Sequence, residues 1–183
     1  MKSGLSFDVV VIGGGQAGCS AAADYAGKGL SVCIVSEGLP FSASGSKTPY
    51  AALSELQNKG VTVLKGDRVL SGVISGGKVE SVFTRNLGPS TPLNAETFIL
   101  ATGKFFSRGL MSDKEHIWEP VFNADVIADS DRTQWYNPDF YARQPYMDYG
   151  VRTDSEGRVS VGGAFVGNLY ATGGIIGHEK RND

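Results

Sequence analysis

Three glycines near the start of the chain, spaced as Gly13-x-Gly15-x-x-Gly18, constrain its fold more than any other feature. They stand between a β-branched run at residues 7–12 (FDVVVI) and an alanine-rich segment at residues 16–28. A buried strand, a glycine turn and a helix in this order, followed by a second apolar strand at residues 31–35, form a βαβ unit. The pattern predicts an α/β fold that binds a dinucleotide at the glycine turn.

Each glycine of this fingerprint has its own physical role. Gly13 permits the sharp turn, Gly15 lets the backbone approach a pyrophosphate, and Gly18 allows the helix to pack closely on the strand. The N–H groups at the start of the helix favour the negative charge of the pyrophosphate. A tight structural turn that binds no ligand is the alternative interpretation of the same residues.

A carboxylate for the ribose of the dinucleotide is expected about 20 residues after the fingerprint, at the end of the second strand. Ser36 occupies that position, and Glu37 follows one residue later. Either Glu37 reaches the ribose through an adjusted turn, or Ser36 and the backbone make the contact. A Glu37 that is merely solvated is the third alternative.

The middle of the chain departs from a simple alternation of strands and helices. A Ser/Gly/Pro-rich stretch at residues 41–49 indicates a loop, and residues 50–59 form a short amphipathic pattern that predicts a helix. Residues 61–85 alternate with period two and are interrupted at residues 65–67 and 75–77. This pattern predicts a meander of three short antiparallel strands. A further hairpin is expected over residues 150–161.

Two later strands end in Ala-Thr-Gly: an apolar strand at residues 97–101, closed by Thr102 and Gly103, and a strand within residues 168–177 (NLYATGGIIG). A meander in place of a crossover helix, followed by such a late strand, resembles the FAD domain of the glutathione-reductase-like flavoproteins. The resemblance implies an α/β, Rossmann-like FAD-binding domain with a parallel sheet, a crossover antiparallel β-meander and few helices. In that group the first strand end lies near the adenosine and pyrophosphate, and the second lies beside the ribityl chain and flavin.

Charge and cysteine usage exclude several other functions. Seventeen Lys and Arg against nineteen Asp and Glu give a net charge of −2, which gives no reason to expect nucleic acid or an anionic membrane as a partner. No apolar run approaches the ~18 residues of a transmembrane helix. Cys19 and Cys33 lie in apolar segments, which predicts buried free thiols, and neither has metal-ligand spacing to His116 or His178. We therefore expect no metal site and a reducing compartment, the cytoplasm.

Longer phrases permit a closer comparison. The phrase ATGKFFSRGL at residues 101–110 is the most specific, and GDRVLSGVISGGKVESVFTRN at 66–86, EPVFNADV at 119–126 and WYNPDFYARQPYMDYGVRTD at 135–154 accompany it. Together with a serine-rich loop at residues 42–46 (SASGS), these phrases resemble the flavoprotein B subunit of anaerobic glycerol-3-phosphate dehydrogenase. The resemblance covers residues 7–46 and 58–177.

This resemblance implies a flavin-dependent oxidoreductase that works with partner dehydrogenase subunits. Together they would oxidise glycerol 3-phosphate to dihydroxyacetone phosphate and pass the electrons to quinone, with membrane association through the partner subunits. The implied cofactor is FAD, although the family is also compatible with FMN. A non-catalytic, shortened flavin-binding or scaffolding domain is the alternative hypothesis.

The resemblance and the fingerprint together nominate cofactor-binding residues in the glycine turn, the end of the second strand, the serine-rich loop, the meander and the two Ala-Thr-Gly strand ends. They are Gly13, Gly15, Gln16, Ala17, Gly18, Ser36, Glu37, Ser44, Gly45, Ser46, Val69, Ala101, Thr102, Gly103, Gly173, Gly174 and Ile175. For the chemistry on the substrate, the available acids, bases and cations are His116, Arg143, Tyr146, Tyr149 and Arg152, and none of them is assigned a catalytic role.

Three departures from the family pattern accompany the resemblance. Residues 47–51 bridge the place where the family has a long segment, and the family continues past Gly177 into a final helix. Many related flavoproteins have an acid for the ribityl hydroxyls where this chain has Gly174. We expect residues 1–183 to form a single, shortened FAD-binding domain.

Overall fold

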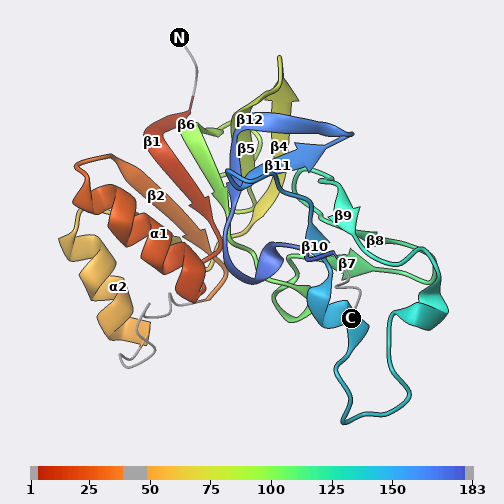
Figure 1. Ribbon diagram of the computed structural model, residues 1–183. Helices are drawn as coiled ribbons and strands as arrows, with labels where there is room; N and C mark the ends of the chain where they lie inside the picture. Colours follow the sequence, from red (N-terminus) through yellow and green to blue (C-terminus); the bar gives the residue numbers. More distant parts are fainter. Residues whose placement is uncertain (1–3, 39–48, 180–183) are drawn as a thin grey trace.

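The computed structural model describes residues 4–38 and 49–179 and is built around one mixed sheet (Figure 1). Along this sheet the strands follow the order β11-β12-β6-β1-β2-β3. Five neighbouring strands are parallel: β12 (Ala164–Ala171), β6 (Leu93–Leu100), β1 (Leu5–Ile12), β2 (Val32–Ser36) and β3 (Thr62–Lys65). The predicted α/β class with a parallel sheet is confirmed.

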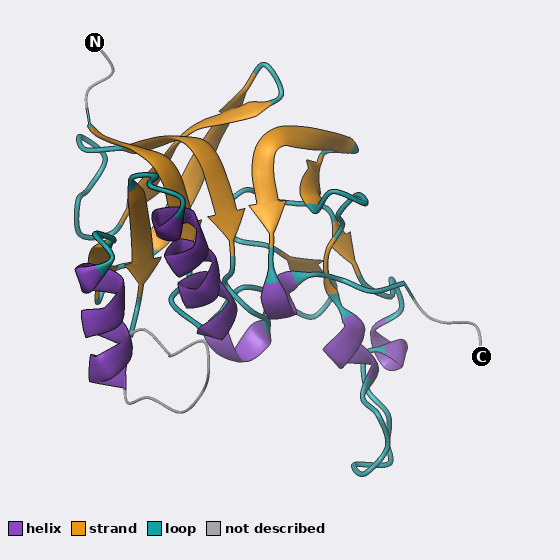
Figure 2. Ribbon diagram, turned by 60° about the vertical axis from the view of Figure 1, so that its left-hand side comes forward, coloured by secondary structure: helices purple, strands orange, loops and turns teal. Residues whose placement is uncertain are grey.

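One face of the sheet is covered by α1 (Gln16–Gly27) and α2 (Pro49–Asn58), the two α-helices of the described residues (Figures 1 and 2). The side of α1 that is buried carries small residues, including Cys19 and Ala22, which join one apolar cluster with Val9 and Val11 of β1. Small side chains let the helix axis lie close to the strands, which positions the start of α1 directly after the glycine turn.

The opposite face of the sheet packs on the antiparallel hairpin of β4 (Val69–Ser75) and β5 (Lys78–Thr84). Because side chains alternate across a strand, Val10 and Ile12 of β1 join a second apolar cluster with residues of this hairpin, whereas Val9 and Val11 face α1. Both sets are almost completely buried. Burial on two faces explains why β1 has an almost unbroken apolar sequence.

The prediction of three antiparallel strands over residues 61–85 is wrong in its first strand. β3 pairs in parallel with β2, from Cys33↔Thr62 to Ser36↔Lys65, and forms the edge of the main sheet. Only β4 and β5 form the antiparallel hairpin, and β5 joins β6 through Val82↔Leu93. A half-exposed parallel edge strand shows the same period-two alternation as a meander strand, so the pattern could not separate them.

Much of the second half of the chain consists of short elements outside the main sheet. The pairs are β7 (Met111–Ser112) with β8 (Ile117–Trp118) and β9 (Val126–Ile127) with β10 (Gly150–Val151). β11 (Arg158–Val161) pairs with β12 at the edge of the main sheet. Within the described residues, the 3-10 helices of this half are η1 (Phe105–Ser107), η2 (Arg132–Gln134), η3 (Pro145–Asp148) and η4 (Gly173–Ile175). The hairpin expected over residues 150–161 is reduced to a Thr153↔Val159 bridge, because β10 pairs with β9.

One further expectation can be checked in the described part of the chain. Cys19 and Cys33 are buried thiols that form no disulfide, as predicted. Within residues 4–38 and 49–179, no cluster of three or more His, Cys, Asp or Glu side chains could hold a metal ion. None of the helices in these ranges is long and apolar enough to cross a membrane.

Candidate functional site

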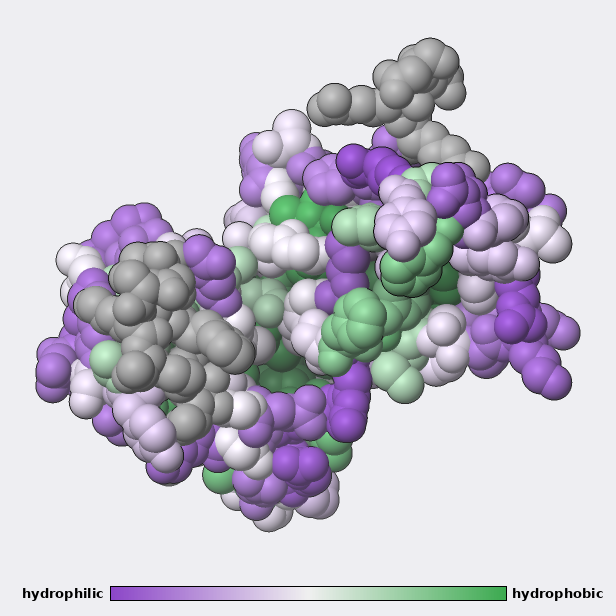
Figure 3. All heavy atoms as spheres, turned by 90° about the horizontal axis from the view of Figure 1, so that it is seen from below, coloured by the Kyte–Doolittle hydropathy of each residue, from purple (hydrophilic) through white to green (hydrophobic). Residues whose placement is uncertain are grey.

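Two adjoining pockets lie at the carboxyl ends of the parallel strands, on the hollowed lower side of the molecule (Figure 3). The first pocket, of about 500 Å³, lies between the start of α1, the end of β6 and η4. The second pocket, of about 290 Å³, lies over the ends of β1, β2 and β6. Gly15, Ala101 and Gly103 line both pockets. This is the edge of a parallel sheet at which α/β proteins bind their ligands.

Most of the residues expected at a cofactor site lie around these pockets. The first pocket is lined by Gly15, Gln16, Ala17, Ala101, Gly103, Gly173 and Gly174, and the second adds Gly13, Ser36, Glu37, Val69 and Thr102. Gly18 and Ile175 line neither pocket, and both are buried. Ser44, Gly45 and Ser46 lie outside the described residues.

Gly13 and Gly18 close the turn between β1 and α1. Gly13 has a φ of +112°, and a Cβ atom there would lie 2.3 Å from the carbonyl oxygen of Ala101. A Cβ at Gly18 would lie 1.9 Å from the carbonyl oxygen of Gly13. Because neither position has room for a side chain, these two glycines serve the close packing of helix and strands.

Gly15 has a different environment. Its backbone is extended, with φ −72° and ψ −178°, so a side chain there would cause no backbone strain. A Cβ at Gly15 would meet no atom of the described residues within 4 Å, and it would point into free space at the pockets. Gly15 is also the N-cap of α1, where no described side chain caps the helix and the first turn carries no acid. An anion can therefore approach the N-terminus of α1.

The opposite wall of the first pocket is made of backbone. Gly173 has a φ of +73°, and a Cβ there would lie 2.5 Å from the Cβ of Ala17. A Cβ at Gly174 would be 4.0 Å from the Cα of Gly103. At Gly173 and Gly174, η4 thus lies close to the start of α1 and the end of β6 with no side chain of its own between them, which brings the two Ala-Thr-Gly strand ends together.

The two candidates for the ribose contact differ in what they bind. Ser36 is buried, and its hydroxyl donates a hydrogen bond of 2.9 Å to the carbonyl oxygen of Gly38. The carboxylate of Glu37 lies at the rim of the second pocket, 3.7 Å from the guanidinium of Arg108. Arg108 also lines this pocket, and no motif in the sequence indicated it.

A buried carboxylate, that of Asp67, lies in the lining of the second pocket. Asp67 accepts hydrogen bonds from the backbone N–H of Arg68, the hydroxyl of Thr84 and the backbone N–H of Asn86, at 2.6–2.9 Å. These bonds fix the turn that presents Arg68 and Val69 to the pocket. Burial, and secondarily the charge of Asp67, raises the pKa of the Cys33 thiol to about 12, so Cys33 remains protonated and unreactive.

A second buried carboxylate fixes the other wall. Glu119 is fully buried, and its carboxylate accepts backbone N–H groups from Val121 and Phe122, each at 2.8 Å. Burial raises the pKa of Glu119, although these hydrogen bonds oppose the shift. The turn that Glu119 organises places Val121 against the second pocket.

The hydroxyl of Thr102 has no hydrogen-bond partner among the described residues. It is buried, and it is the side-chain polar atom of the described residues for which no hydrogen-bond partner is found. Thr102 lines the second pocket, between the glycine turn and η1. A buried donor next to a pocket gains a partner when a polar ligand binds.

None of the candidates for chemistry on a substrate lines either pocket. His116 is exposed beside Asp113, Arg143 lies 2.5 Å from Asp148, and Arg152 lies 3.5 Å from Glu179. The hydroxyl of Tyr149 donates to the carbonyl oxygen of Gln134, and the ring of Tyr146 packs edge-on against Phe105.

These features together fit a bound dinucleotide. Gly15 and the N-terminus of α1 border the two joined pockets, and Thr102, whose buried hydroxyl has no hydrogen-bond partner among the described residues, lines the second pocket. The comparison with protein families agrees: residues 8–48 and 47–180 match the family described as FAD binding domain. This chain belongs to that family. The prediction of FAD as the cofactor is thereby confirmed.

The FAD-binding chain is also similar to curated relatives. Over 139 residues it is 36% identical to the B subunit of the anaerobic glycerol-3-phosphate dehydrogenase of Yersinia enterocolitica, a match that covers 76% of this chain and 32% of the relative. It is 39% identical over 141 residues to the corresponding protein of Vibrio vulnificus, with 75% and 32% covered. The chain therefore spans about a third of the length of these relatives. The resemblance seen in the sequence is confirmed.

Solved structures are more distant. The FAD-binding chain has a TM-score of 0.47 and 16% identity to the myxobacterial chondrochloren halogenase CndH, a variant of FAD-dependent halogenases. The matched region covers 55% of this chain and 38% of the halogenase.

Proposed function

We propose that residues 1–183 act as one FAD-binding domain, with the cofactor extended across both pockets. The AMP half occupies the second pocket, between Glu37, Val69 and Val121. The diphosphate lies on the backbone at Gly15 and the start of α1, and the ribityl chain and flavin continue along the first pocket toward Gly174. The open space beside Gly15, in a chain of the FAD binding domain family, is the observation that carries this proposal.

Different residues bind different parts of the cofactor. Backbone N–H groups at the N-terminus of α1 stabilise the diphosphate without a charged side chain. Glu37 accepts hydrogen bonds from the ribose hydroxyls, while Ser36 remains bonded to Gly38. The Thr102 hydroxyl gains the hydrogen bond that it lacks in the free site. Apolar groups of Val69 and Val121 border the adenine.

We further propose that the domain is the flavin-carrying part of an oxidoreductase that converts glycerol 3-phosphate to dihydroxyacetone phosphate. The names of the relatives, at 34–39% identity, support this substrate. Bound FAD would take up the two electrons of the alcohol oxidation, and quinone is the proposed final acceptor. A non-catalytic flavin-binding or scaffolding domain is the second candidate, because no candidate acid or base of the described residues lines a pocket.

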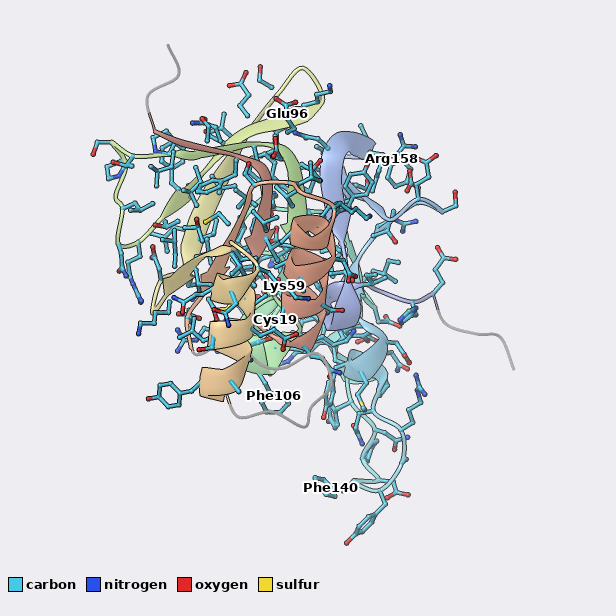
Figure 4. The ribbon with its side chains drawn as sticks, turned by 90° about the vertical axis from the view of Figure 1, so that its left-hand side faces the viewer. Cys19, Lys59, Glu96, Phe106, Phe140 and Arg158 are labelled. Atoms are coloured by element: carbon cyan, nitrogen blue, oxygen red, sulfur yellow. The ribbon has the colours of Figure 1, made fainter. Side chains whose placement is uncertain are left out.

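Partner dehydrogenase subunits are part of the same proposal. The loop between η2 and η3 projects away from the sheet, and Phe140 and Tyr141 at its tip are 85% and 95% exposed (Figure 4). Gln144 holds the loop by accepting the backbone N–H of Asn137 and donating to the carbonyl oxygen of Asp139. Exposed aromatic rings on an ordered loop are typical of protein interfaces. They support docking to a partner dehydrogenase subunit, through which the domain would associate with the membrane from the cytoplasm.

The proposal separates binding from turnover. The purified chain, reconstituted with FAD and kept without oxygen, receives glycerol 3-phosphate or, as the control, glycerol, and the visible absorption of the flavin is followed. We expect the isolated chain to bind FAD and the flavin to remain oxidised when glycerol 3-phosphate is added. Once the relatives' partner subunits are present, glycerol 3-phosphate should reduce the flavin and bleach its absorption. Bleaching of the isolated chain would contradict the need for partners. Bound FAD that glycerol 3-phosphate never reduces would favour the scaffolding alternative.

A further inference from the structure

An ion pair joins the segments that follow β2 and β6 at the second pocket. Glu37 directly follows β2, and Arg108 lies at the end of η1, which follows β6. Since β1 lies between β6 and β2 in the sheet, the turn that begins at Gly13 follows the strand between the two segments that carry these side chains. The guanidinium and the carboxylate are 3.7 Å apart, and both residues line the second pocket.

The backbone at Arg108 is held in an unusual conformation. Its φ of 60° and ψ of 22° are left-handed, a region that a residue with a long side chain rarely adopts outside sites with a special role. Its N–H donates to the carbonyl oxygen of Phe105, and the hydroxyl of Ser107 donates to the carbonyl oxygen of Thr102 at 2.6 Å. Gly109 follows, where a Cβ would lie 2.0 Å from the carbonyl oxygen of Gly103. This compact loop fixes the direction in which Arg108 leaves the backbone.

The ion pair of Arg108 at the second pocket is one that can be exchanged for another partner. The charged lining residues of this pocket are Glu37, Asp67, Arg68 and Arg108. Asp67 is buried and bonded to its own turn. The contact between Arg108 and Glu37 is longer than a hydrogen bond, and their side chains are 61% and 37% exposed. A solvated pair of this kind is weak and exchanges readily.

We infer that Arg108 is a binding residue for the diphosphate of FAD. This inference rests on the proposed function. When Glu37 accepts the ribose hydroxyls, the guanidinium of Arg108 is released and turns to the phosphate oxygens at the glycine turn below it. The planar guanidinium can form two parallel hydrogen bonds with a phosphate, which the backbone at Gly15 alone does not supply. Arg108 thereby contributes the side-chain cation that the fingerprint lacks.

The inference is tested with Arg108→Ala, and with ADP and adenosine as probes that differ in the diphosphate. The control is Arg152→Ala, which removes an exposed Arg–Glu pair that lines neither pocket. Isothermal titration calorimetry at low salt should give an about tenfold weaker affinity of Arg108→Ala for FAD and ADP, the loss expected for a charge-assisted hydrogen bond at an exposed site. The affinity for adenosine should be unchanged, and Arg152→Ala should bind like the wild type.

Added salt provides a second readout. Ions screen an exposed cation from a phosphate, so rising salt should weaken ADP binding more in the wild type than in Arg108→Ala. Arg108→Lys, which keeps the charge but not the planar group, should lie between the two. If Arg108→Ala does not fold, Arg108→Gly removes the same side chain at a φ that glycine adopts freely.

The outcomes separate this inference from the proposed function. A wild-type chain that binds neither FAD nor ADP would overturn both. A wild type that binds FAD, together with an Arg108→Ala variant of equal affinity for ADP, would overturn only the role of Arg108. Equal losses for ADP and adenosine would also contradict it, because they would place the effect on the nucleoside.

Discussion

The carbonyl oxygen of Gly13 lies 1.9 Å from the position that a Cβ atom at Gly18 would occupy. These two residues of the fingerprint therefore touch through backbone alone, whereas Gly15 between them faces open space. Three glycines of one motif thus have two kinds of role. Gly13 and Gly18 are required by the packing of α1 on β1 and β6, and Gly15 is free for a ligand.

The first prediction concerns this packing. Gly18→Ala should lower the free energy of unfolding by about 1–3 kcal/mol, the range for overpacking a well-packed core, because its methyl group must displace backbone. Urea unfolding measures the change. Gly27→Ala, at a helical position with no described atom within 4 Å of the new Cβ, is the control and should be neutral or stabilising. Equal stability of Gly18→Ala and the wild type would contradict the packing role.

The second prediction assigns the ribose contact. Glu37→Gln should weaken FAD binding by about 1–3 kcal/mol, the range for losing a hydrogen bond to a charged group. Ser36→Ala should leave the affinity nearly unchanged, since the Ser36 hydroxyl is already bonded to Gly38. Fluorescence titration with FAD measures both. The opposite ranking would move the contact to Ser36.

The third prediction follows from the buried carboxyl of Glu119, whose pKa is raised by burial. The folded state then holds this proton more tightly than the unfolded state does. The contribution of Glu119 to stability is therefore largest below the ordinary pKa of 4.5 and decreases as the pH rises toward the folded pKa. Relative to Glu119→Gln, which does not titrate, the wild type should lose stability with rising pH.

Urea unfolding of the wild type and Glu119→Gln, from below pH 4.5 upward, measures how the difference in their free energies of unfolding changes with pH. The other carboxyl groups are common to the two proteins and cancel in the difference. A difference that stays constant, or that grows in favour of the wild type as the pH rises, would show that burial does not govern this group.

The fourth prediction concerns the exposed aromatic tip. Changing Phe140 and Tyr141 together to Ser should alter the free energy of unfolding by no more than about 0.5 kcal/mol, because both rings are exposed. FAD binding should also be unchanged. Association with a partner dehydrogenase subunit, measured by analytical ultracentrifugation, should be lost. Unchanged association would exclude this loop from the interface.

Much of this architecture could be predicted from the sequence. The fingerprint and the apolar runs around it predict β1, α1 and β2, because a strand buried on both faces must be apolar throughout. Most residues nominated for the cofactor lie around the two pockets, since parallel strands bring their carboxyl ends to one edge of the sheet. The sequence patterns that predicted these elements correctly each lie within one short segment of the chain.

The features that could not be predicted depend on contacts between distant segments. The residues of β3 alternate with period two, as they would in either a parallel edge strand or a meander strand. Only the pairing of β3 with β2 decides between the two. Arg108 has a left-handed backbone without being glycine, and its partner Glu37 is far away in the sequence. Phe140 and Tyr141 are large aromatic residues, which a sequence pattern assigns to the core, but both are exposed at a loop tip.

The stoichiometry of bound FAD in the wild type and in Gly15→Val tests whether the diphosphate binds at the glycine turn. The new side chain would enter the space proposed for the diphosphate, while the extended backbone at Gly15 accepts it without strain. Gly27→Val, remote from the pockets, is the matched control. We predict one FAD per chain in the wild type and the control, and none in a folded Gly15→Val. Full FAD occupancy in Gly15→Val would contradict this role of Gly15, because the fingerprint would then be a structural turn only.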